Sequence, residues 1–181
     1  KYEETMNKIS EYQTEKESDE KTAKLLQNEL EELSTYLGLT DVQGEGITII
    51  LTDNGGQELN NSSDEKIVSI SSLDLLRVIR DLFSAGAEAI SINDQRLIST
   101  SSIECDGNII KVNGEKIGAP FTIKAIGIPE VLINVNRVGG YLDILKEDRY
   151  LKVTVEKMTD KKTITIPKYT GVMKFQYAQS K

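Results

Sequence analysis

The first 37 residues contain neither glycine nor proline and are rich in Glu, Lys, Gln and Leu. These straight side chains lose little conformational freedom in a helix, and no residue in the segment breaks one, so the composition predicts a long exposed helix. Gly38 stands where a helix C-cap is expected and therefore ends it. We expect two units, a coiled coil or exposed helix over 1–40 and a folded domain over 41–181.

Apolar residues recur in the helical segment at steps of three and four, which is the spacing of a coiled-coil seam. The regular part of this series is Ala23, Leu26, Leu30, Leu33 and Leu37. Further upstream, Lys16 and Asp19 occupy positions that need apolar side chains. We expect self-association through the regular part. Packing on a different partner and a solitary solvated helix are the alternatives, and the oligomeric order stays open.

Charge is distributed unevenly between the two units. Residues 1–45 contain 5 Lys against 12 Asp and Glu, a net charge of −7, whereas residues 46–181 contain 17 basic and 17 acidic residues. Binding to a phosphate backbone requires a clustered basic surface, which this pattern does not supply. Nucleic acid is therefore not an expected partner.

The chain has one Cys and no His. A zinc site of Cys and His ligands cannot be assembled from this set, nor can a Ser-His or Cys-His catalytic pair. The spacings of calcium loops and phosphate-binding loops are also absent. We expect no metal, no cofactor and no enzymatic activity, and we expect Cys105 to be a small buried strand residue.

Residues 47–93 follow the pattern strand, helix, strand. Alternation of Ile47, Ile49 and Leu51 with their neighbours predicts a first strand, and 54–68 have the composition of a loop. A helix capped by Ser71 or Ser72 then runs to Gly86. Its apolar positions are Leu75, Leu76, Val78, Ile79, Leu82 and Phe83. "AEAISIN" returns as a strand, which the right-handed crossover rule makes parallel to the first.

Two hairpin turns are predicted at Asp106-Gly107 and Asn113-Gly114, because such pairs between apolar residues favour tight β-turns. They imply short strands at 103–105, 109–112 and 115–117. "FTIKAIG" supplies a further strand, and the hydroxyl run "STSS" at 99–102 is expected at a strand edge.

The last third of the chain repeats the pattern. Pro129 suits the first turn of a helix with apolar positions at Val131, Leu132, Val135 and Val138, and "YLDILKED" forms a second short helix. "YLKVTVEKM" and "KTITIP" are predicted as strands joined by a hairpin through Asp160-Lys161, followed by a strand "VMKFQY". The order β-α-β, hairpin, β-α-β predicts an α+β fold, a ferredoxin-like sandwich with extra hairpin strands.

A polar group at the end of the strand "AISI" is the candidate ligand site. It comprises Asn93, Gln95 and Arg96, since an arginine beside amides can hold a carboxylate or phosphate through its planar fork. The alternative is a plain turn in which Asn93 and Asp94 bond to nearby backbone. We expect no catalytic residue, because no nucleophile stands beside a base.

Four stretches carry a family pattern: Gly86 to Asn93, Gln95 to Arg96, Asn113-Gly114 and Phe121 to Gly127. This pattern resembles that of the bacterial YlxW/YlxX-type family, known as domain of unknown function 881. "LTDN" near Asp53 and "GGYLDILK" extend the resemblance over roughly residues 44–167. The chain departs from the pattern at Asp94, where the family has Gly, and a carboxylate there could neutralise Arg96.

The resemblance implies a domain held outside a bacterial membrane by an amino-terminal anchor and a coiled coil. Some members are labelled division-initiation proteins, and no activity is established for the family. No run of eighteen apolar residues is present and no initiator Met opens the chain, so we expect the single-pass anchor upstream of Lys1.

The expected function is that of a non-enzymatic, membrane-tethered scaffold on the extracytoplasmic side, linked to division or the cell envelope and binding an unknown protein partner. A small-ligand sensor for anions or metabolites is the alternative. An acylphosphatase-like hydrolase is a third reading, which the lack of a basic anion-cradling loop after the first strand disfavours.

Overall fold

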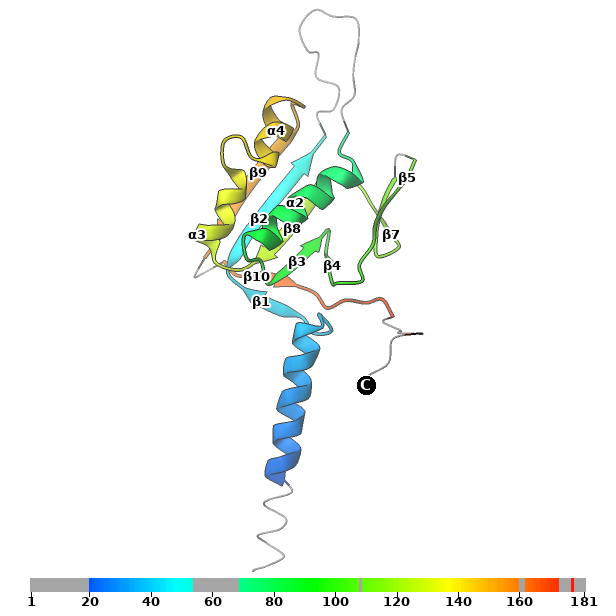
Figure 1. Cartoon of the computed structure of the whole chain (residues 1–181), viewed down its shortest axis with the longest axis vertical. Helices are drawn as coiled ribbons and strands as arrows, with labels where there is room; N and C mark the ends of the chain where they lie inside the picture. Colours follow the sequence, from blue (N-terminus) through cyan, green and yellow to red (C-terminus); the bar gives the residue numbers. More distant parts are fainter. Residues whose placement is uncertain (1–19, 54–68, 108, 160–161, 173–176, 178–181) are drawn as a thin grey trace, which may run out of the picture.

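The computed structural model of the chain describes residues 20–53, 69–107, 109–159, 162–172 and 177. A helix over residues 20–36 projects from an α+β body, and a short two-stranded sheet lies between the two (Figure 1). The α+β class is therefore as predicted. The irregular seam around Lys16, the predicted loop over 54–68, the turn at Asp160-Lys161 and most of the predicted strand "VMKFQY" lie outside the described residues.

A five-stranded sheet forms the centre of the body. Its order is β4-β3-β8-β2-β9. The bounds are Gly46–Thr52 for β2, Ala89–Ile92 for β3, Gln95–Arg96 for β4, Phe121–Ile126 for β8 and Lys152–Met158 for β9. Both β2 and β3 pair antiparallel with β8, which lies between them. They are therefore parallel to each other, as the crossover rule predicted.

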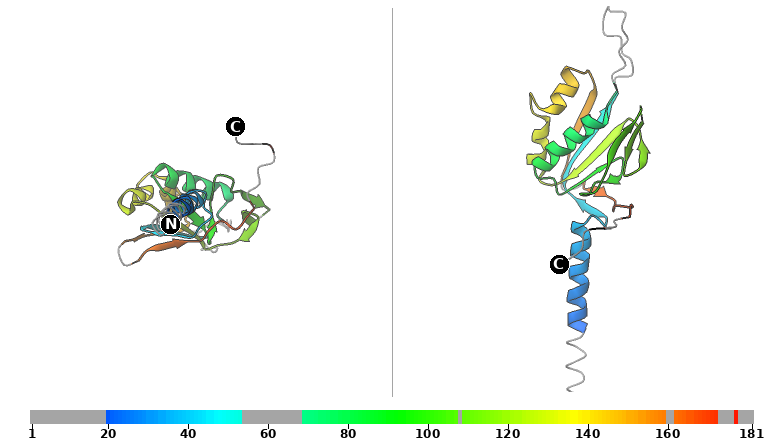
Figure 2. Two further views of the ribbon diagram at one scale, coloured as in Figure 1. Left: turned by 90° about the horizontal axis from the view of Figure 1, so that it is seen from below. Right: turned by 45° about the vertical axis from the view of Figure 1, so that its right-hand side comes forward.

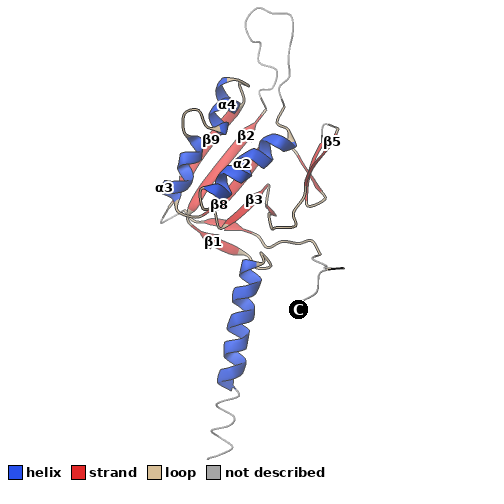
Figure 3. Cartoon of the chain, viewed as in Figure 1, coloured by secondary structure: helices blue, strands red, loops and turns tan. Residues whose placement is uncertain are grey.

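Helices cover one face of this sheet (Figure 3). They are α2 (Ser72–Ser84), α3 (Pro129–Leu132), the 3-10 helix η1 (Ile133–Asn136) and α4 (Tyr141–Glu147). Every second residue of β2 points toward them, and these side chains are fully buried against the apolar stripe of α2. The central contacts involve Ile47, Ile49, Leu51, Leu75, Val78 and Leu82.

The start of α2 is fixed by its capping residues. Ser71 is the N-cap and accepts a hydrogen bond from the backbone N–H of Asp74, whose side chain accepts one in return from the N–H of Ser71. This reciprocal capping box satisfies two otherwise free helix donors. The buried stripe is narrower than predicted, because Leu76 and Phe83 remain 43% and 48% exposed.

A second, three-stranded sheet stands beside the first, on the side away from α3 and α4 (Figure 2). Its strands are β5 (Ile103–Asp106), β6 (Ile109–Val112) and β7 (Glu115–Ile117), joined at the two predicted hairpins. The predicted burial of Cys105 is wrong, because β5 is the outer strand of this sheet and most of its side chains reach solvent.

Two predictions for the last third of the chain are wrong. The helix at Pro129 ends after one turn and continues as 3-10 helix, which leaves Val138 outside any helix and 93% exposed. The strand "KTITIP" becomes β10 (Ile164–Ile166), but it pairs with β1 (Val42–Gly44) rather than β9. Ile164 and Ile166 are buried in a small apolar cluster with Ala89 and Ile126, and this packing holds β10 against the end of the five-stranded sheet.

The end of the helix over 20–36 is attached to the body. Gly38 has φ +75, and a Cβ atom there would lie 2.7 Å from Cγ2 of Ile98. Glycine is therefore required both for the left-handed turn and for the close contact. The carbonyl of Gly38 also accepts a hydrogen bond of 2.8 Å from the N–H of Tyr169. Within the described part of the chain, no helix is long and apolar enough to cross a membrane.

Candidate functional site

The polar group predicted as a ligand site lies on the hairpin of β3 and β4. Its two loop residues, Asn93 and Asp94, both have positive φ, at 45 and 63, which a two-residue hairpin of this hand requires. The segment is thus a turn in its backbone, as the alternative interpretation held. Its side chains point to three different places.

Asn93 holds the hairpin against the start of β8. Its amide nitrogen donates to the carbonyls of Gly118 (3.1 Å) and Pro120 (3.4 Å), and its Oδ1 accepts from the N–H of Thr122 at 2.7 Å. These bonds use both ends of the side-chain amide. Asn93 is therefore a clamp between strands, and it does not line either of the two cavities described below.

Asp94 does not neutralise Arg96. Its Oδ1 lies 2.6 Å from Nζ of Lys124 on β8, an exposed ion pair. Gln95 precedes Arg96 on β4, and neighbouring residues on a strand point to opposite faces. The three predicted ligand residues therefore do not form one site, and Arg96 alone remains as a candidate.

Arg96 is 5% exposed, although it carries a charge. Burial lowers the pKa of its guanidinium. The backbone of this residue is firmly held, because its carbonyl accepts a 2.8 Å hydrogen bond from Nδ2 of Asn113 and a longer one from Oγ of Ser101. Its side chain lies against Gly38, whose hypothetical Cβ would be 3.5 Å from Nε.

Arg96 lines a cavity of about 500 Å³ where the helix over 20–36 meets the body. One wall comes from the end of that helix, a second from α2 and the residue before β3, and a third from Arg96 of β4 and the residues that follow it. The walls consist of Tyr36, Leu37, Gly38, Phe83, Glu88, Leu97, Ile98 and Ser99. The cavity is thus mostly apolar with one buried cation, a combination typical of small-ligand pockets, whose volumes are about 300–1,000 Å³.

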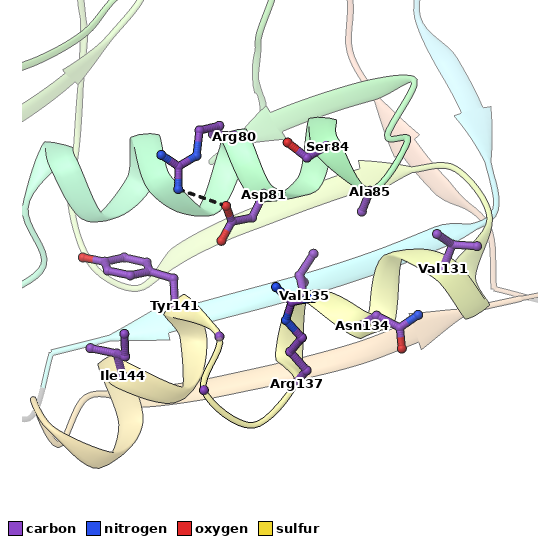
Figure 4. Close-up of a pocket in the computed structure, with 12 residues that line it drawn as sticks. Arg80, Asp81, Ser84, Ala85, Val131, Asn134, Val135, Arg137, Tyr141 and Ile144 are labelled. Atoms are coloured by element: carbon purple, nitrogen blue, oxygen red, sulfur yellow. Dashed lines mark hydrogen bonds and ion pairs between the residues drawn. The ribbon is translucent and has the colours of Figure 1, made fainter.

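A second cavity, also about 500 Å³, lies between α2 and the segment from α3 to α4 (Figure 4). Arg80 and Asp81 on its α2 side form an ion pair of 3.2 Å, and Arg80 is largely exposed. Asn134 on the opposite side donates to the carbonyl of Glu130. No buried polar side chain of the described residues is left without a partner in this cavity.

Beside this second cavity, a buried carboxylate joins α2 to α4. Asp74 is 3% exposed, and its Oδ1 accepts hydrogen bonds from the hydroxyl of Tyr141 (2.5 Å) and from Nη1 of Arg149 (2.6 Å). Burial alone would raise the pKa of Asp74, but the hydrogen bonds from Tyr141, Ser71 and Arg149 outweigh it and hold that pKa below its usual value. Arg77 lies over the Tyr141 ring at 5.0 Å.

Sequence reasoning missed this network. The serine and aspartate three residues apart at the start of α2 do indicate a cap. Nothing in the local sequence indicates that Tyr141 and Arg149, 67 and 75 residues away, contact the same carboxylate. Among the residues that the structure places, no group of three or more His, Cys, Asp or Glu could hold a metal ion.

Comparison with known proteins identifies the family to which this sequence belongs. The sequence profile described as "Bacterial protein of unknown function (DUF881)" matches residues 29–179. The chain belongs to the DUF881 family. That match covers the end of the projecting helix and the body, so both belong to the DUF881 region.

Several bacterial DUF881 relatives are similar over much of the chain. UPF0749 protein YlxW of Bacillus subtilis is 37% identical over 128 residues, 70% of this chain and 54% of that protein. UPF0749 protein YlxX of the same bacterium is 30% identical over 166 residues, 91% of this chain and 67% of that protein. UPF0749 protein Rv1823 of Mycobacterium tuberculosis is 30% identical over 123 residues, and 40% of it is covered. The chain thus spans roughly half the length of these relatives.

A solved structure shares the DUF881 fold. The crystal structure of an uncharacterized conserved protein from Mycobacterium tuberculosis superimposes with a TM-score of 0.65 at 25% identity. The match covers 84% of this chain and 99% of that one.

The predicted self-association residues of the DUF881 chain lie on the projecting helix and its end. Leu26, Leu30, Leu33 and Leu37 are each more than half exposed, at 56, 65, 57 and 52%. Ala23 is exposed as well. These five residues, called the leucine seam below, are thus available to a partner.

Proposed function

We propose that this protein is a non-enzymatic interaction module that self-associates through the leucine seam and presents the α+β body at the end of the helix. The observation that carries the proposal is the exposure of four leucines at coiled-coil spacing, three on the helix over 20–36 and Leu37 directly after it. A single helix in water is marginally stable. One with an exposed leucine stripe gains stability when a partner covers that stripe.

A second copy of the chain fits the seam better than a strongly charged partner does. The positions that flank a seam decide which helices can pair. Around Leu30 these flanking residues are Gln27, Glu29, Ser34 and Tyr36. Only one of the four is charged, and in a parallel pair Glu29 would face Ser34 of the second copy. Two copies therefore meet without like charges across the seam.

The strand order of the body also bears on the proposal. The two β-α-β halves contribute β2 with β3 and β8 with β9, and the sheet order β3-β8-β2-β9 alternates the halves. We assign this arrangement to the ferredoxin-like sandwich, with β4, the β5–β7 sheet and the β1–β10 pair as additions. Fold alone does not specify a function, so the role proposed here depends on the seam.

For the cellular setting, the proposal adopts the expectation that the resemblance of the sequence to the YlxW/YlxX-type family raises. We place the module on the outer side of a bacterial membrane, tethered by a single-pass anchor and acting in division or envelope processes with a protein partner. The test is protease treatment of intact cells that express the full-length protein with a tag on the body. Loss of the tagged body without cell lysis is expected, and its protection until lysis would contradict this placement.

The self-association test replaces one seam residue by a charged one. Leu30→Lys places an ammonium group in the seam, whereas Asn28→Lys adds the same charge on the opposite side of the same helix. We expect the unchanged chain and Asn28→Lys to show an oligomer mass by light scattering at micromolar concentrations. Leu30→Lys should shift the mass to that of the monomer.

Two outcomes would contradict the proposal. One is a monomer mass for the unchanged chain across the whole concentration range. The other is an equal mass for Leu30→Lys and Asn28→Lys, which would place the interface away from the seam. Circular dichroism of both variants checks that the helix is retained, since Lys is a good helix former.

A further inference from the structure

Arg96 is buried at a cost that the described residues do not offset. A charged group removed from water normally requires an ion pair or a full set of hydrogen bonds. Two of its guanidinium nitrogens, Nε and Nη1, are buried and have no hydrogen-bond partner among the residues that the structure describes. None of the ion pairs among the described residues involves Arg96, and Asp94, two positions before it, is paired with Lys124.

The remaining unpartnered groups gather around the same residue. Besides the two arginine nitrogens, the buried side-chain atoms without a partner in the described residues are Oγ of Ser91 and Oδ1 of Asn113. Ser91 lies directly opposite Arg96 in the β3–β4 pairing. Asn113 donates its Nδ2 to the carbonyl of Arg96. Unsatisfied buried groups are few in native proteins, so such a concentration at one residue points to an additional group that binds there.

The cavity beside Arg96 could hold such a group. Five of its lining residues are apolar or aromatic and come from three different parts of the chain, namely Tyr36, Leu37, Phe83, Leu97 and Ile98. Phe83 is exposed, although it lies on the same helix as the buried core stripe. A ligand in the cavity would cover this ring and the end of the projecting helix together.

We propose that this cavity binds a small carboxylic acid, with the carboxylate on Arg96 and an apolar body against Phe83 and the end of the helix over 20–36. Leu37 belongs both to the leucine seam and to the lining of the cavity. The inference is carried by Arg96 and Phe83, which lie outside the seam, and it does not depend on self-association.

The charges of the cavity favour a carboxylate over a doubly charged phosphate. Among the described residues that line the cavity, Arg96 is the single cation and Glu88 is the single acid. One guanidinium matches one carboxylate through its planar fork. A second negative charge on the ligand would face Glu88 without a cation of its own. The apolar walls add burial for a hydrocarbon chain or ring, which inorganic phosphate cannot use.

The carboxylate can come from a free acid or from the end of a peptide, and two pairs of probes distinguish these sources. Octanoate and octanamide represent a free acid and its uncharged counterpart. N-acetyl-leucine and N-acetyl-leucinamide represent a peptide end and its uncharged counterpart. Inorganic phosphate and acetate complete the set, the first testing charge and the second testing the need for an apolar body.

Nuclear magnetic resonance of the arginine Nε–H groups in the unchanged chain gives a direct measurement. We expect octanoate or N-acetyl-leucine to shift the Arg96 signal in a saturable way, and the stronger binder identifies the source. The matching amides and phosphate should leave the signal in place, and acetate should bind more weakly. An Arg96 signal that responds to neither acid, or that responds more strongly to phosphate, would overturn the proposal.

Variants then locate the site. Arg96→Met should lower the affinity for the binding acid by about tenfold or more, the value of one charge-assisted hydrogen bond. Phe83→Ala, which removes an exposed wall, should weaken binding several-fold. Leu73→Ala removes an exposed side chain from the same helix outside the cavity and serves as the control.

Calorimetric titration of these variants measures the affinities. Phe83→Ala keeps the test decisive if Arg96→Met does not fold, because its side chain is half exposed. Equal affinities for Phe83→Ala and Leu73→Ala would overturn the assignment of the acid to this cavity, as would unchanged binding by a folded Arg96→Met.

Discussion

Asp74 and Arg96 are both charged and both almost completely buried, yet their surroundings differ in kind. The Asp74 carboxylate accepts hydrogen bonds from Ser71, Tyr141 and Arg149, and its charge is compensated by an arginine. The Arg96 guanidinium has two buried nitrogens that find no partner in the described part of the chain. Asp74 thus has the fully bonded surroundings of a charge that stabilises the fold, whereas Arg96 has the incompletely bonded surroundings that we propose for a ligand-binding charge.

The difference separates two reasons for burying a charge. A fully bonded buried charge links the elements that supply its partners, and Asp74 links the start of α2 to the first residue of α4 and to Arg149, two positions beyond the end of α4. A partly bonded one lowers stability, and proteins tolerate such a cost mainly where it serves a function. The comparison therefore predicts that removing the two groups will change stability in opposite directions.

The largest effect is expected for Asp74→Ala. The change removes the carboxylate that accepts from the Ser71 N–H in the capping box and leaves the Tyr141 hydroxyl and the Arg149 guanidinium without their partner. We expect the free energy of unfolding to fall by about 3 kcal/mol, less than for a fully buried pair because Arg149 can still reach water. Urea unfolding followed by circular dichroism measures it. Asp81→Ala on the same helix is the control, with a change below about 1 kcal/mol expected for its exposed ion pair. Similar values for the two variants would remove the basis of the comparison.

A pH dependence should accompany this effect. The folded-state pKa of Asp74 is lowered, so its contribution to stability is complete above the unfolded-state pKa of about 4 and is lost as the pH falls through the folded-state value. The difference in unfolding free energy between the unchanged chain and Asp74→Ala should therefore be constant above about pH 5 and shrink below about pH 4. Other carboxylates cancel in this difference. A difference that stays constant down to pH 3 would show that Asp74 acts through its shape rather than its charge.

The same contrast marks what the sequence could predict. The strands at Ile47, Ile90 and Phe121, both hairpin turns and the caps of α2 follow from local patterns, because alternation, Asp-Gly and Asn-Gly pairs and capping residues act over a few positions. The strands, the caps and the Asn113-Gly114 turn are confirmed, and the first hairpin forms with Asp106 in β5, paired with Ile109, rather than in the turn. The parallel relation of β2 and β3 also followed, since crossover handedness is a general rule.

Long-range choices could not be predicted in this way. The pairing of β10 with β1 rather than β9 depends on which apolar surface Ile164 and Ile166 reach, and strand patterns do not encode this. The exposure of Cys105 likewise depends on β5 being an outer strand. For the candidate site, the sequence pattern indicated Arg96 but grouped it with Asn93 and Gln95. Asn93 is instead bonded to the backbone at the start of β8, and Gln95 points to the opposite face of the strand from Arg96.

The smallest stability effect, and the one that tests the comparison most sharply, is expected for Arg96→Met. Methionine reaches about as far as arginine Nε, the atom nearest Gly38, while it removes a charge whose burial the described residues do not compensate. Replacing poorly paired buried charges by apolar residues of similar volume is often neutral or stabilising. We expect an unfolding free energy equal to that of the unchanged chain or up to about 1–2 kcal/mol higher. The backbone hydrogen bonds from Asn113 and Ser101 to the Arg96 carbonyl do not depend on the side chain.

Arg96→Lys provides the matched control, because lysine keeps the charge but has fewer hydrogen-bond donors than arginine. If burial of the charge is the cost, Arg96→Lys should be less stable than Arg96→Met. A loss of about 3 kcal/mol in Arg96→Met, comparable with Asp74→Ala, would mean that the guanidinium is satisfied in the folded chain and that the two residues have the same structural role. An Arg96→Met variant that is stable but no longer binds the acid would instead separate stability from binding at a single residue. The cost of burying the guanidinium would then be offset only when a carboxylate occupies the cavity.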